Sequence, residues 1–413
     1  MDQGNSQRHS SRPRPRSGLP RSHIFPCLGR ASPAYSAQTS WRNLTFSAIS
    51  FVNVTKKFRK VLAVDRLAFE VRDGQYLCVL GPTGSGKTTL LRLIAGLLKP
   101  TEGTIYFDGK PVNEIDAHDR NAVYVPQQYA LFPHLTVLEN VAFGPLARGK
   151  PESEALEVAR RTLEMVKLSW RAQAYPNELS GGMQQRVALA RGLASGAHLL
   201  LLDEPLGALD ARLRLELRHK LRELVKQSGF TAIHVTHDRD EAMSVGDQVM
   251  VLRGGKILDH GIPRRVYTKP SGIFVANLIG RANFLEGFVE TSTRKSSTVR
   301  MREGLMVQTP VMSLPVNEHV ILGIKKESVN ISFERSQIEN ELKGEIREVR
   351  FLGNSREYLI RLTNGAILAS RRFLEGSEPS FRLGDAVWVT FQRIDVTAFP
   401  YPRQGLMKEL EVV

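Results

Sequence analysis

Short apolar segments alternate with longer helical patterns between residue 44 and about residue 280. Segments 44–58 and 67–71 indicate an antiparallel start to this region. Short, strongly apolar runs are typical of buried strands, and helical segments follow each of them; the runs are 75–80, Leu199–Leu202 and 231–236. This order predicts an α/β domain over residues 44–280 with a largely parallel sheet.

Two helical patterns stand out within this domain. Leucines recur at steps of four and three after the second apolar run, which places them on one stripe of a helix; they are Leu209, Leu213, Leu217, Leu221 and Leu224. We expect this stripe to pack the helix onto the sheet. Residues 129–178 form a mostly helical insertion, in which 153–168 is the clearest helix.

The pattern changes from about residue 283 to short segments of alternating apolar and polar residues. Segments 356–362 and 366–370 flank Thr363-Asn364-Gly365, and an Asn-Gly pair between two such segments predicts a β-hairpin. Segment 386–399 is another alternating strand. Residues 283–413 are therefore predicted to form an all-β domain, a small barrel.

Composition sets few limits on this chain of 413 residues. Apolar residues make up 42% and charged residues 24%, which are ordinary values for a globular protein. The apolar runs are far shorter than the roughly 20 residues that cross a bilayer as a helix. Two cysteines, Cys27 and Cys78, do not suffice for a disulfide framework or a metal cluster, and Cys78 is expected in the core.

The first 43 residues carry much of the net charge of +15, with seven arginines against the single acid Asp2. Serine, arginine and proline dominate this segment, which predicts disorder. An organelle transit peptide, a mis-assigned start before Leu44 and a basic membrane-touching arm all fit it. The remaining charge is spread thinly over the chain, unlike a nucleic-acid footprint, so we expect no nucleic-acid partner.

A glycine-rich loop follows the apolar run 75–80 and opens a helix, in the pattern of a P-loop. Glycines let the backbone fold tightly, so that its N–H groups and the helix N-terminus face phosphates. Lys87 would add a charge at the β- and γ-phosphates, and the Thr88 hydroxyl would bind Mg²⁺. The predicted phosphate-binding residues are Gly81, Pro82, Thr83, Gly84, Ser85, Gly86, Lys87, Thr88 and Thr89.

Asp203 and Glu204 directly follow Leu199–Leu202. A buried strand in this position delivers Asp203 to the metal ion, and the adjacent Glu204 is placed to polarise an attacking water. The alternative is that this pair only caps the following turn.

A second helix start, at Ser180-Gly181-Gly182, is also suited to bind an anion. Such a helix end and the P-loop are not expected to serve the same phosphate within one chain. The natural solution is a head-to-tail pair of chains, in which each chain completes the nucleotide site of the other.

Taken together, these motifs resemble the ATP-binding subunits of ABC transporters over roughly residues 46–400. The segment 179–186 resembles that family's signature motif, with Met183 where glutamine is commoner, followed by Gln184. The resemblance implies a RecA-like P-loop NTPase domain with antiparallel and helical subdomains, the cofactors ATP and Mg²⁺, and a homodimer.

The same resemblance assigns roles to four further residues. Gln127 matches the loop glutamine that senses Mg²⁺ and the membrane subunits, with Gln128 the weaker candidate. Asp210 belongs to a segment that couples the two sites of a dimer. His237 matches the histidine that hydrogen-bonds the γ-phosphate, and Phe58 the aromatic that stacks on adenine. Without the family, a structural role is the simpler interpretation of His237, and a core position for Phe58 is as simple as adenine stacking.

The C-terminal region resembles the TOBE-type domain of importer ATPases, through segments 283–287, 322–324 and 384–399. This implies two separate membrane permease subunits and, indirectly, a substrate-binding protein, with cargo such as sulfate, molybdate, iron(III), polyamine or sugar. The family often has Ile-Arg-Pro-Glu where this chain has Ile324-Lys-Lys-Glu327, so no regulatory site is carried over.

The expected location is peripheral, on the cytoplasmic face of the cell membrane, or on the stromal face of an organelle inner membrane if residues 1–43 are a transit peptide. An exporter subunit and a soluble ABC ATPase of repair or translation are the alternatives. The latter usually carry coiled-coil insertions, zinc motifs or two ATPase domains, and none is visible in this sequence. The motifs do not encode the cargo.

Overall fold

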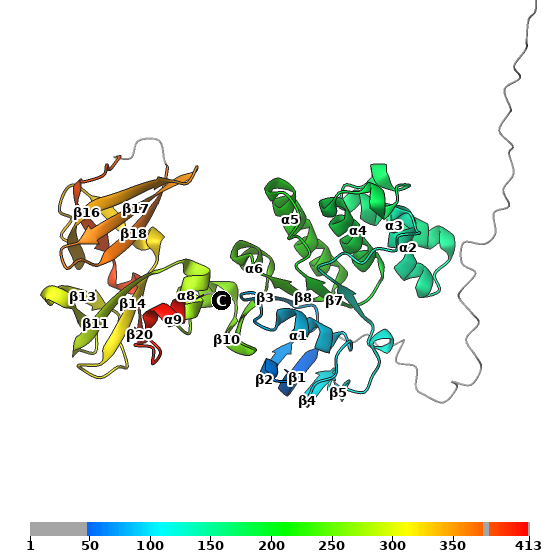
Figure 1. Ribbon diagram of the computed structural model, residues 1–413, viewed down its shortest axis with the longest axis horizontal. Coiled ribbons are helices and arrows are strands. Elements are labelled where there is room, and N and C mark those ends of the chain that lie inside the picture. The colour runs from blue at the N-terminus through cyan, green and yellow to red at the C-terminus, as the bar shows by residue number, and fades with distance from the viewer. Residues whose placement is uncertain (1–47, 375–379, 412–413) are drawn as a thin grey trace, which may run out of the picture. The chain divides into compact units, whose positions relative to one another are not determined.

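The computed structural model of the protein describes residues 48–374 and 380–411. The segment 1–43, which the sequence leaves open to three interpretations, lies outside the described residues. Among the described helices, none is long and apolar enough to span a bilayer. An α/β region extends to about residue 280 and an all-β region follows it (Figure 1).

A six-stranded sheet at the centre of the α/β region consists of β3 (Tyr76–Leu80), β6 (Ala122–Val125), β7 (Leu199–Asp203), β8 (Thr231–Thr236), β9 (Gln248–Arg253) and β10 (Lys256–Gly261). Its order is β10–β9–β3–β8–β7–β6. All neighbours are parallel except β10, which pairs antiparallel with β9 at one edge. β3, β7 and β8 are buried throughout, which explains their unbroken apolar sequences.

The two faces of this sheet pack into different cores. Leu77 and Val79 of β3 lie in the core that contains α1 (Lys87–Ile94). Cys78 and Leu80 point to the opposite face and lie in the core that contains α5 (Ala211–Ser228). The alternation follows from the two-residue period of a strand. Cys78 is fully buried, as predicted, and burial raises the pKa of its thiol.

The predicted leucine stripe packs α5 onto the sheet. Leu217 and Leu221 are buried in the same core as Cys78, whereas Leu213 and Leu224 are partly buried at its margin. Leu209 is buried but lies before the helix begins. The leucine stripe therefore has the expected structural role: it packs α5 against the central sheet.

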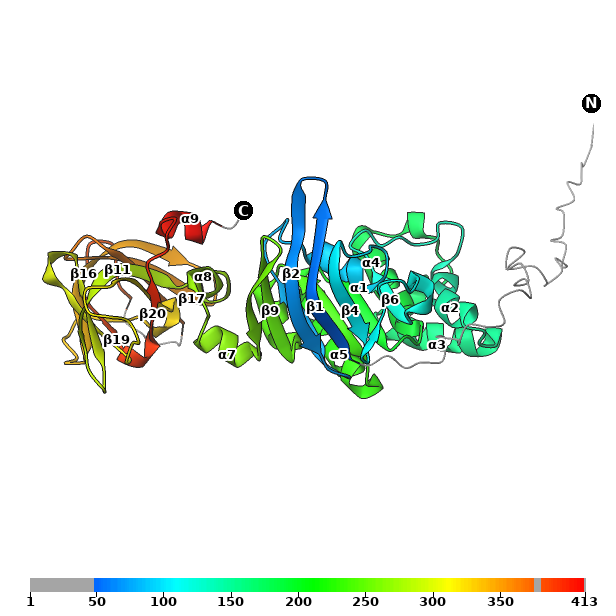
Figure 2. The same cartoon turned by 90° about the horizontal axis from the view of Figure 1, so that it is seen from below.

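A second, antiparallel sheet consists of β1 (Ile49–Phe58), β2 (Val61–Val71), β4 (Glu102–Phe107) and β5 (Lys110–Pro111), in the order β2–β1–β4–β5 (Figure 2). Phe51 and Phe69 stack across β1 and β2 with ring centroids 4.6 Å apart. Their side chains enter the core that contains α1. The antiparallel start predicted from the sequence is confirmed.

Three helices form a separate layer with its own core: α2 (Val137–Ala147), α3 (Glu152–Met165) and α4 (Gly181–Ala194). Thr136 and Glu139 cap each other's backbone at the start of α2, in a capping box. α3 covers most of the run predicted as the clearest helix. α4 contributes residues both to this core and to the core beneath the central sheet, so it joins the helical layer to the sheet.

The all-β region consists of two five-stranded antiparallel sheets that share one core. The first has the order β13–β12–β11–β14–β20, with β11 (Asn283–Ser292), β12 (Ser297–Met301), β13 (Met306–Thr309), β14 (His319–Ile324) and β20 (Val396–Pro400). The second has the order β15–β19–β16–β17–β18, with β15 (Asn330–Ser332), β16 (Asn340–Phe351), β17 (Ser355–Leu362), β18 (Ile367–Phe373) and β19 (Ala386–Phe391). The predicted hairpin is β17–β18, and Gly365 in its turn has a φ of +79°.

Short helices lie where the α/β region meets the β region: α6 (Arg239–Val245), α7 (Pro263–Thr268), α8 (Ile273–Gly280) and α9 (Leu406–Leu410). Of these, α7 and α8 connect the two regions along the chain. Ile273 of α8 packs with Ile321 and Phe399 in a small core. Arg253, at the end of β9, donates to the carbonyl oxygen of Glu409 in α9 at 3.1 Å and pairs with the Glu409 carboxylate at 3.2 Å. Helix α9 is thus attached to the end of β9.

Arg120 holds the C-terminal end of α1 to the loop that precedes β6. Its side chain is buried, and it donates to the carbonyl oxygens of Leu93 at 2.8 Å, Ile94 at 3.0 Å and Val112 at 2.6 Å. Burial lowers the pKa of its guanidinium to about 10. The interaction satisfies carbonyl groups that the end of a helix leaves without an intrahelical partner.

We expect Arg120→Ala to lower the free energy of unfolding by about 3 kcal/mol, because it leaves buried carbonyl groups without donors. Arg120→Lys, which keeps a donor, should lose less. Urea denaturation followed by circular dichroism measures both. Arg72→Ala, at an exposed position, is the control and should change stability by no more than about 0.5 kcal/mol. A loss below about 1 kcal/mol for Arg120→Ala would contradict this role.

Candidate functional site

The glycine-rich loop lies between β3 and α1, as the sequence predicts. Gly84 has a φ of +78° and Gly86 a φ of +101°, in the left-handed region that glycine tolerates best. A Cβ atom on Gly86 would lie 2.4 Å from the carbonyl oxygen of Ala63. The loop therefore has both the backbone conformation and the close packing that require glycine at this position.

Lys87, the first residue of α1, is buried, and its side chain folds back along the loop. Its Nζ donates to the carbonyl oxygens of Gly81 at 2.9 Å and Pro82 at 2.7 Å. Burial lowers the pKa of Lys87, against the nearby carboxylates of Glu204 and Asp203, which raise it. The ammonium group is thus held at the mouth of the loop, in reach of an anion bound by its backbone amides.

Asp203 ends β7 next to the start of α1. Its Oδ1 accepts a hydrogen bond from the Thr88 hydroxyl at 3.2 Å, and its Oδ2 accepts one from the Tyr124 hydroxyl at 3.0 Å. Burial raises the pKa of Asp203, although both hydrogen bonds lower it. Burial and the charge of Asp203 also raise the pKa of Tyr124 to about 12. A hydroxyl and a carboxylate side by side fit Mg²⁺, which takes few protein oxygens and completes its shell with phosphates and water.

Glu204 contacts β8, the turn that follows it and the loop that carries Gln127. Its backbone is in the left-handed region, with a φ of +49°, and its N–H donates to the carbonyl oxygen of Val235 at 2.9 Å. The carboxylate accepts a hydrogen bond from Gln127 Nε2 at 2.9 Å, and His237 Nδ1 lies 3.4 Å from the same oxygen. A non-glycine residue in this conformation is strained, and strain of this kind concentrates at functional sites.

The turn that carries His237 is supported by buried polar groups at the end of β8. The Thr236 hydroxyl donates to Glu241 Oε2 at 2.5 Å and accepts a hydrogen bond from the Asp238 N–H at 3.0 Å. Asp238 in turn caps α6 through the N–H groups of residues 240 and 241. These hydrogen bonds make the turn rigid. His237 itself is exposed, so its imidazole remains accessible.

The second predicted anion-binding end lies at the start of α4. Ser180 is the N-cap, and its hydroxyl accepts from the Met183 N–H at 3.4 Å. Ser180 and Gly181 are exposed. Within the described part of the chain, neither forms a hydrogen bond with the loop 81–88.

One buried side chain joins α4 to the segment that begins with Glu204. Gln185 Nε2 donates to the carbonyl oxygen of Glu204 at 2.8 Å, and Gln185 Oε1 accepts from the Ala208 N–H at 2.9 Å. Ala208 lies just before Asp210, which caps α5 by accepting from the Leu213 N–H at 3.0 Å. A single amide therefore sets the spacing between the signature segment, Glu204 and the Asp210 segment.

Comparisons with known proteins agree with this arrangement. The chain matches the family model described as ABC transporter over residues 64–207 and the model described as TOBE domain over residues 322–399. It is 38% identical over 347 residues to the spermidine/putrescine import ATP-binding protein of Rubrobacter xylanophilus, covering 83% of this chain and 91% of the relative. The chain belongs to the ABC transporter ATP-binding subunits.

A second relative is the Fe(3+) ions import ATP-binding protein of Brucella abortus, with 40% identity over 332 residues and coverage of 80% of this chain and 93% of the relative. A solved dimeric structure of a bacterial ABC transporter cassette is 34% identical with a TM-score of 0.50, covering 52% of this chain and 99% of that chain. The resemblance to an importer-type ABC ATPase with a TOBE domain is thus confirmed, and the chain is an ATP hydrolase coupled to transport.

The ABC ATPase brings most of the predicted residues together within one chain. Thr88 contacts Asp203, and Gln127 and His237 both contact Glu204. Gln127, expected to sense Mg²⁺, forms its hydrogen bond with Glu204 and none with Thr88 or Asp203. Phe58, at the end of β1, has 41% of its surface exposed, beside the Lys56 ammonium 5.2 Å from its ring centroid. It is therefore not a core residue.

Sequence reasoning missed Tyr124 and Gln185 in this ABC ATPase. Tyr124 lies in β6, one strand away from Asp203, and the sequence offers no sign that the two strands are neighbours. Gln185 stands on the apolar side of α4 and is only 4% exposed. Gln185 precedes Ala188 and Leu189 by three and four residues, so it shares their apolar face of the helix. This polar residue on an apolar face was the available signal, because a buried amide requires partners.

We expect Gln185→Ala to lower kcat for ATP roughly tenfold, because it releases the carbonyl of Glu204 and frees the carboxylate to move. The KM for ATP should stay within about twofold, since the phosphate loop is untouched. Steady-state ATPase assays measure both. Gln227→Ala, on the exposed surface of α5, is the control. Equal effects of the two substitutions, or a change confined to KM, would contradict a positioning role for Gln185.

Proposed function

We propose that this chain binds and hydrolyses Mg-ATP as a homodimer and thereby drives two membrane permease subunits of an importer. The observation that carries the proposal is the convergence of Lys87, Asp203, Glu204 and His237 at one edge of the central sheet. Ser180 and Gly181 of the same chain are exposed and form no hydrogen bond with the loop 81–88. One chain thus supplies two different halves of a nucleotide site, and a second copy is required to join them.

Nucleotide binding rests on the loop between β3 and α1. Lys87 and the backbone amides of Gly84–Thr88 hold the phosphates, and Phe58 stacks on adenine, a contact worth about 1–3 kcal/mol for a base on an aromatic ring. Thr88 and Asp203 would hold Mg²⁺, with Gln127 as the nearby residue that senses it. The ion would supply positive charge against the β- and γ-phosphates.

In hydrolysis, Glu204 orients a water and accepts its proton as the oxygen bonds to the γ-phosphorus and the bond to ADP breaks. His237 donates to a γ-phosphate oxygen, and Lys87 stabilises the charge that develops there. The present contacts of the Glu204 carboxylate, with Gln127 and His237, mean that both partners must adjust when a water takes their place.

Closure of the site comes from the partner subunit. Ser180, Gly181 and Gly182 of one chain, with Met183 and Gln184 behind them at the start of α4, cover the γ-phosphate held by the other chain. Asp210 lies at the contact between the two sites. ATP favours the closed dimer, and hydrolysis removes the bridging phosphate and opens it. The dimeric state of the related solved cassette supports this proposal.

The permease subunits dock on the segment Tyr129–Gly144, beside Gln127. Arg191 of α4 donates to the carbonyl oxygens of Ala130 at 2.8 Å and Tyr129 at 3.3 Å. The docking segment is thereby attached to the signature helix. The chain works peripherally, on the cytoplasmic face of the membrane, and displacement of a permease helix reaches both Gln127 and Ser180 through these contacts.

We expect Glu204→Gln to lower kcat by about 10²–10³-fold, because the amide cannot take the proton of the attacking water. Binding of Mg-ATP should remain, and the variant should accumulate as a closed dimer. Size-exclusion chromatography with light scattering at saturating Mg-ATP detects it. A variant that stays monomeric under these conditions would overturn the mechanism.

Ser180 provides a matched pair of controls in the Glu204→Gln background. Ser180→Asp keeps a good N-cap for α4 but places a negative charge against the γ-phosphate, and should abolish the dimer. Ser180→Asn keeps the cap without charge, and the dimer should persist. If both double variants dimerise equally, the signature segment does not touch the phosphate.

For the cargo, we propose a cation, either a polyamine or iron(III), since the two relatives above are named as importers of these. The alignments cover 91% and 93% of those relatives. Cells lacking the chain should lose most ATP-dependent uptake of labelled spermidine or of labelled iron(III), with sulfate uptake unchanged. The wild-type chain should restore uptake and Glu204→Gln should not. Loss of sulfate uptake alone would refute a cationic cargo.

A further inference from the structure

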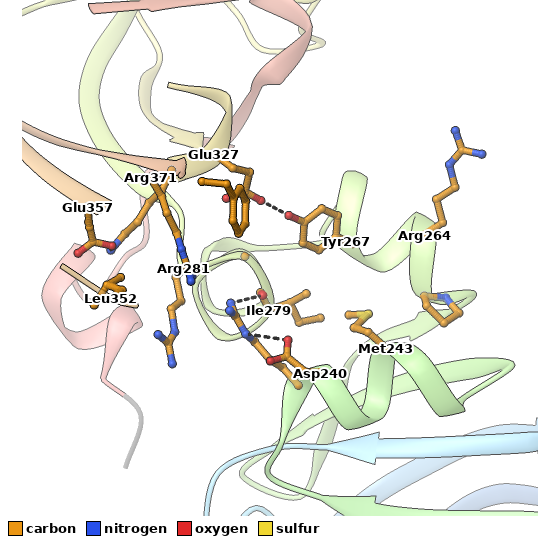
Figure 3. Close-up of a pocket in the computed structure, with 15 residues that line it drawn as sticks. Asp240, Met243, Arg264, Tyr267, Ile279, Arg281, Glu327, Leu352, Glu357 and Arg371 are labelled. Carbon is orange, nitrogen blue, oxygen red and sulfur yellow. Dashed lines mark hydrogen bonds and ion pairs between the residues drawn. The ribbon is translucent and has the colours of Figure 1, made fainter. Parts of the chain in front are cut away.

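A cavity of about 570 Å³ lies where the α/β region meets the β region (Figure 3). Helices α6, α7 and α8 form one side of it, and strands β17 and β18 with the segment after β14 form the other. None of its lining residues belongs to the nucleotide site described above. The cavity is therefore a separate candidate binding site.

Cations outnumber acids on the walls of this cavity. The cationic lining residues are Arg239, Arg264, Arg281, Lys326 and Arg371, and the acidic ones are Asp240, Glu327 and Glu357. Each acid already has a partner. Asp240 pairs with Arg239 at 3.5 Å, and Glu327 accepts a hydrogen bond from Tyr267.

Glu357 lies opposite Arg371 on the neighbouring strand but pairs with other cations. Its Oε2 accepts from Lys326 Nζ at 2.8 Å, and its Oε1 lies 3.6 Å from Arg350. Both oxygens are thus occupied by other cations. The acids of the cavity leave a positive surplus, and Arg281 and Arg371 carry it.

The side chain of Arg281 has no hydrogen bond or ion pair with any described residue, and its backbone holds a left-handed φ of +44° at the end of α8. Among the described residues, Arg371 donates only through Nε, to Ser355 Oγ at 3.1 Å, and its guanidinium lies over the Phe373 ring, 5.6 Å from the centroid. Figure 3 shows both side chains entering the same part of the cavity near Leu352, whereas Arg264 extends away from it. Two guanidinium groups with free N–H donors match the oxygens of a carboxylate or phosphate.

Apolar side chains border these arginines. Leu352 is 45% exposed and Phe373 52% exposed, and both line the cavity together with Met243 and Ile279. Concave sites that combine apolar walls with a few polar groups of fixed position are typical of small-molecule binding. The positive surplus disfavours a polyamine or a metal cation, so the occupant differs from the cargo proposed above.

We propose that this cavity binds a small organic anion, with its charged group on Arg281 and Arg371 and its apolar part against Leu352 and Phe373, and that its occupancy slows ATP hydrolysis. The second half of the proposal rests on the proposed function. The route is short: α6 lines the cavity and begins two residues after His237. Arg239 of α6 also donates to the carbonyl oxygen of Ile279 in α8 at 2.9 Å.

A ligand that joins β18 to α8 therefore restrains α6 and the turn before it. In this structure that turn places His237 Nδ1 3.4 Å from Glu204. A restrained turn keeps the imidazole on the carboxylate and withholds it from the γ-phosphate. The effect should appear in kcat and leave the KM for ATP unchanged.

The probe for binding is isophthalate, an aromatic dicarboxylate, titrated into the full chain by ligand-observed NMR with saturating ADP to occupy the phosphate loop. Isophthalate should bind saturably, at least tenfold more tightly than acetate, which lacks the apolar part. Arg281→Gln and Arg371→Gln should each raise its Kd at least tenfold. Arg294→Gln, at an exposed position of the β region, should leave it unchanged.

The functional arm measures ATPase activity with and without isophthalate. The wild-type chain should lose at least half of its kcat, and Arg281→Gln and Arg371→Gln should lose none. Lys87→Ala should bind isophthalate normally but should not hydrolyse ATP. Isophthalate binding therefore tests the cavity, and ATPase activity separately tests the proposed mechanism of hydrolysis. Absence of binding, or binding unaffected by both arginine substitutions, overturns the site. Binding without a change in kcat overturns the regulation.

Discussion

The parallel register of β3, β7 and β8 is the constraint on which the site depends. Leu80 lies opposite Thr236, and Asp203 lies opposite Val235, so the three strands end at the same level of the sheet. Hydrogen bonds between buried strands fix this level, and a shift by one residue would exchange the side chains that pack into the two different cores on either face of the sheet. The phosphate loop, Glu204 and His237 are the residues that leave the sheet at that edge, where open α/β sheets bind their ligands.

Glu204 is the point at which the separate parts of the molecule meet. Its N–H contacts β8, its carbonyl contacts α4 through Gln185, and its carboxylate contacts Gln127 and His237. The strained backbone of this residue is maintained by these contacts together. Gln185 thus links the position of α4 to that of Glu204, and this link is the physical basis of the coupling to a permease subunit proposed above.

The β region is joined to the α/β region by polar contacts as well as by apolar packing. Arg253 binds the carbonyl groups of α9, and Ile273 packs with Ile321 and Phe399. The cavity with Arg281 and Arg371 lies in this same junction.

The sequence by itself determined the elements and the local motifs, because strand burial, helix periodicity and glycine-rich turns are properties of neighbouring residues. It placed Lys87, Thr88, Asp203, Glu204 and His237 at the ends of the correct elements. Only the tertiary structure decided which elements are neighbours. The contacts of Tyr124 with Asp203 and of Gln185 with Glu204 join residues 79 and 19 positions apart. Such pairs depend on strand order and helix orientation, which long-range packing sets and local patterns do not record.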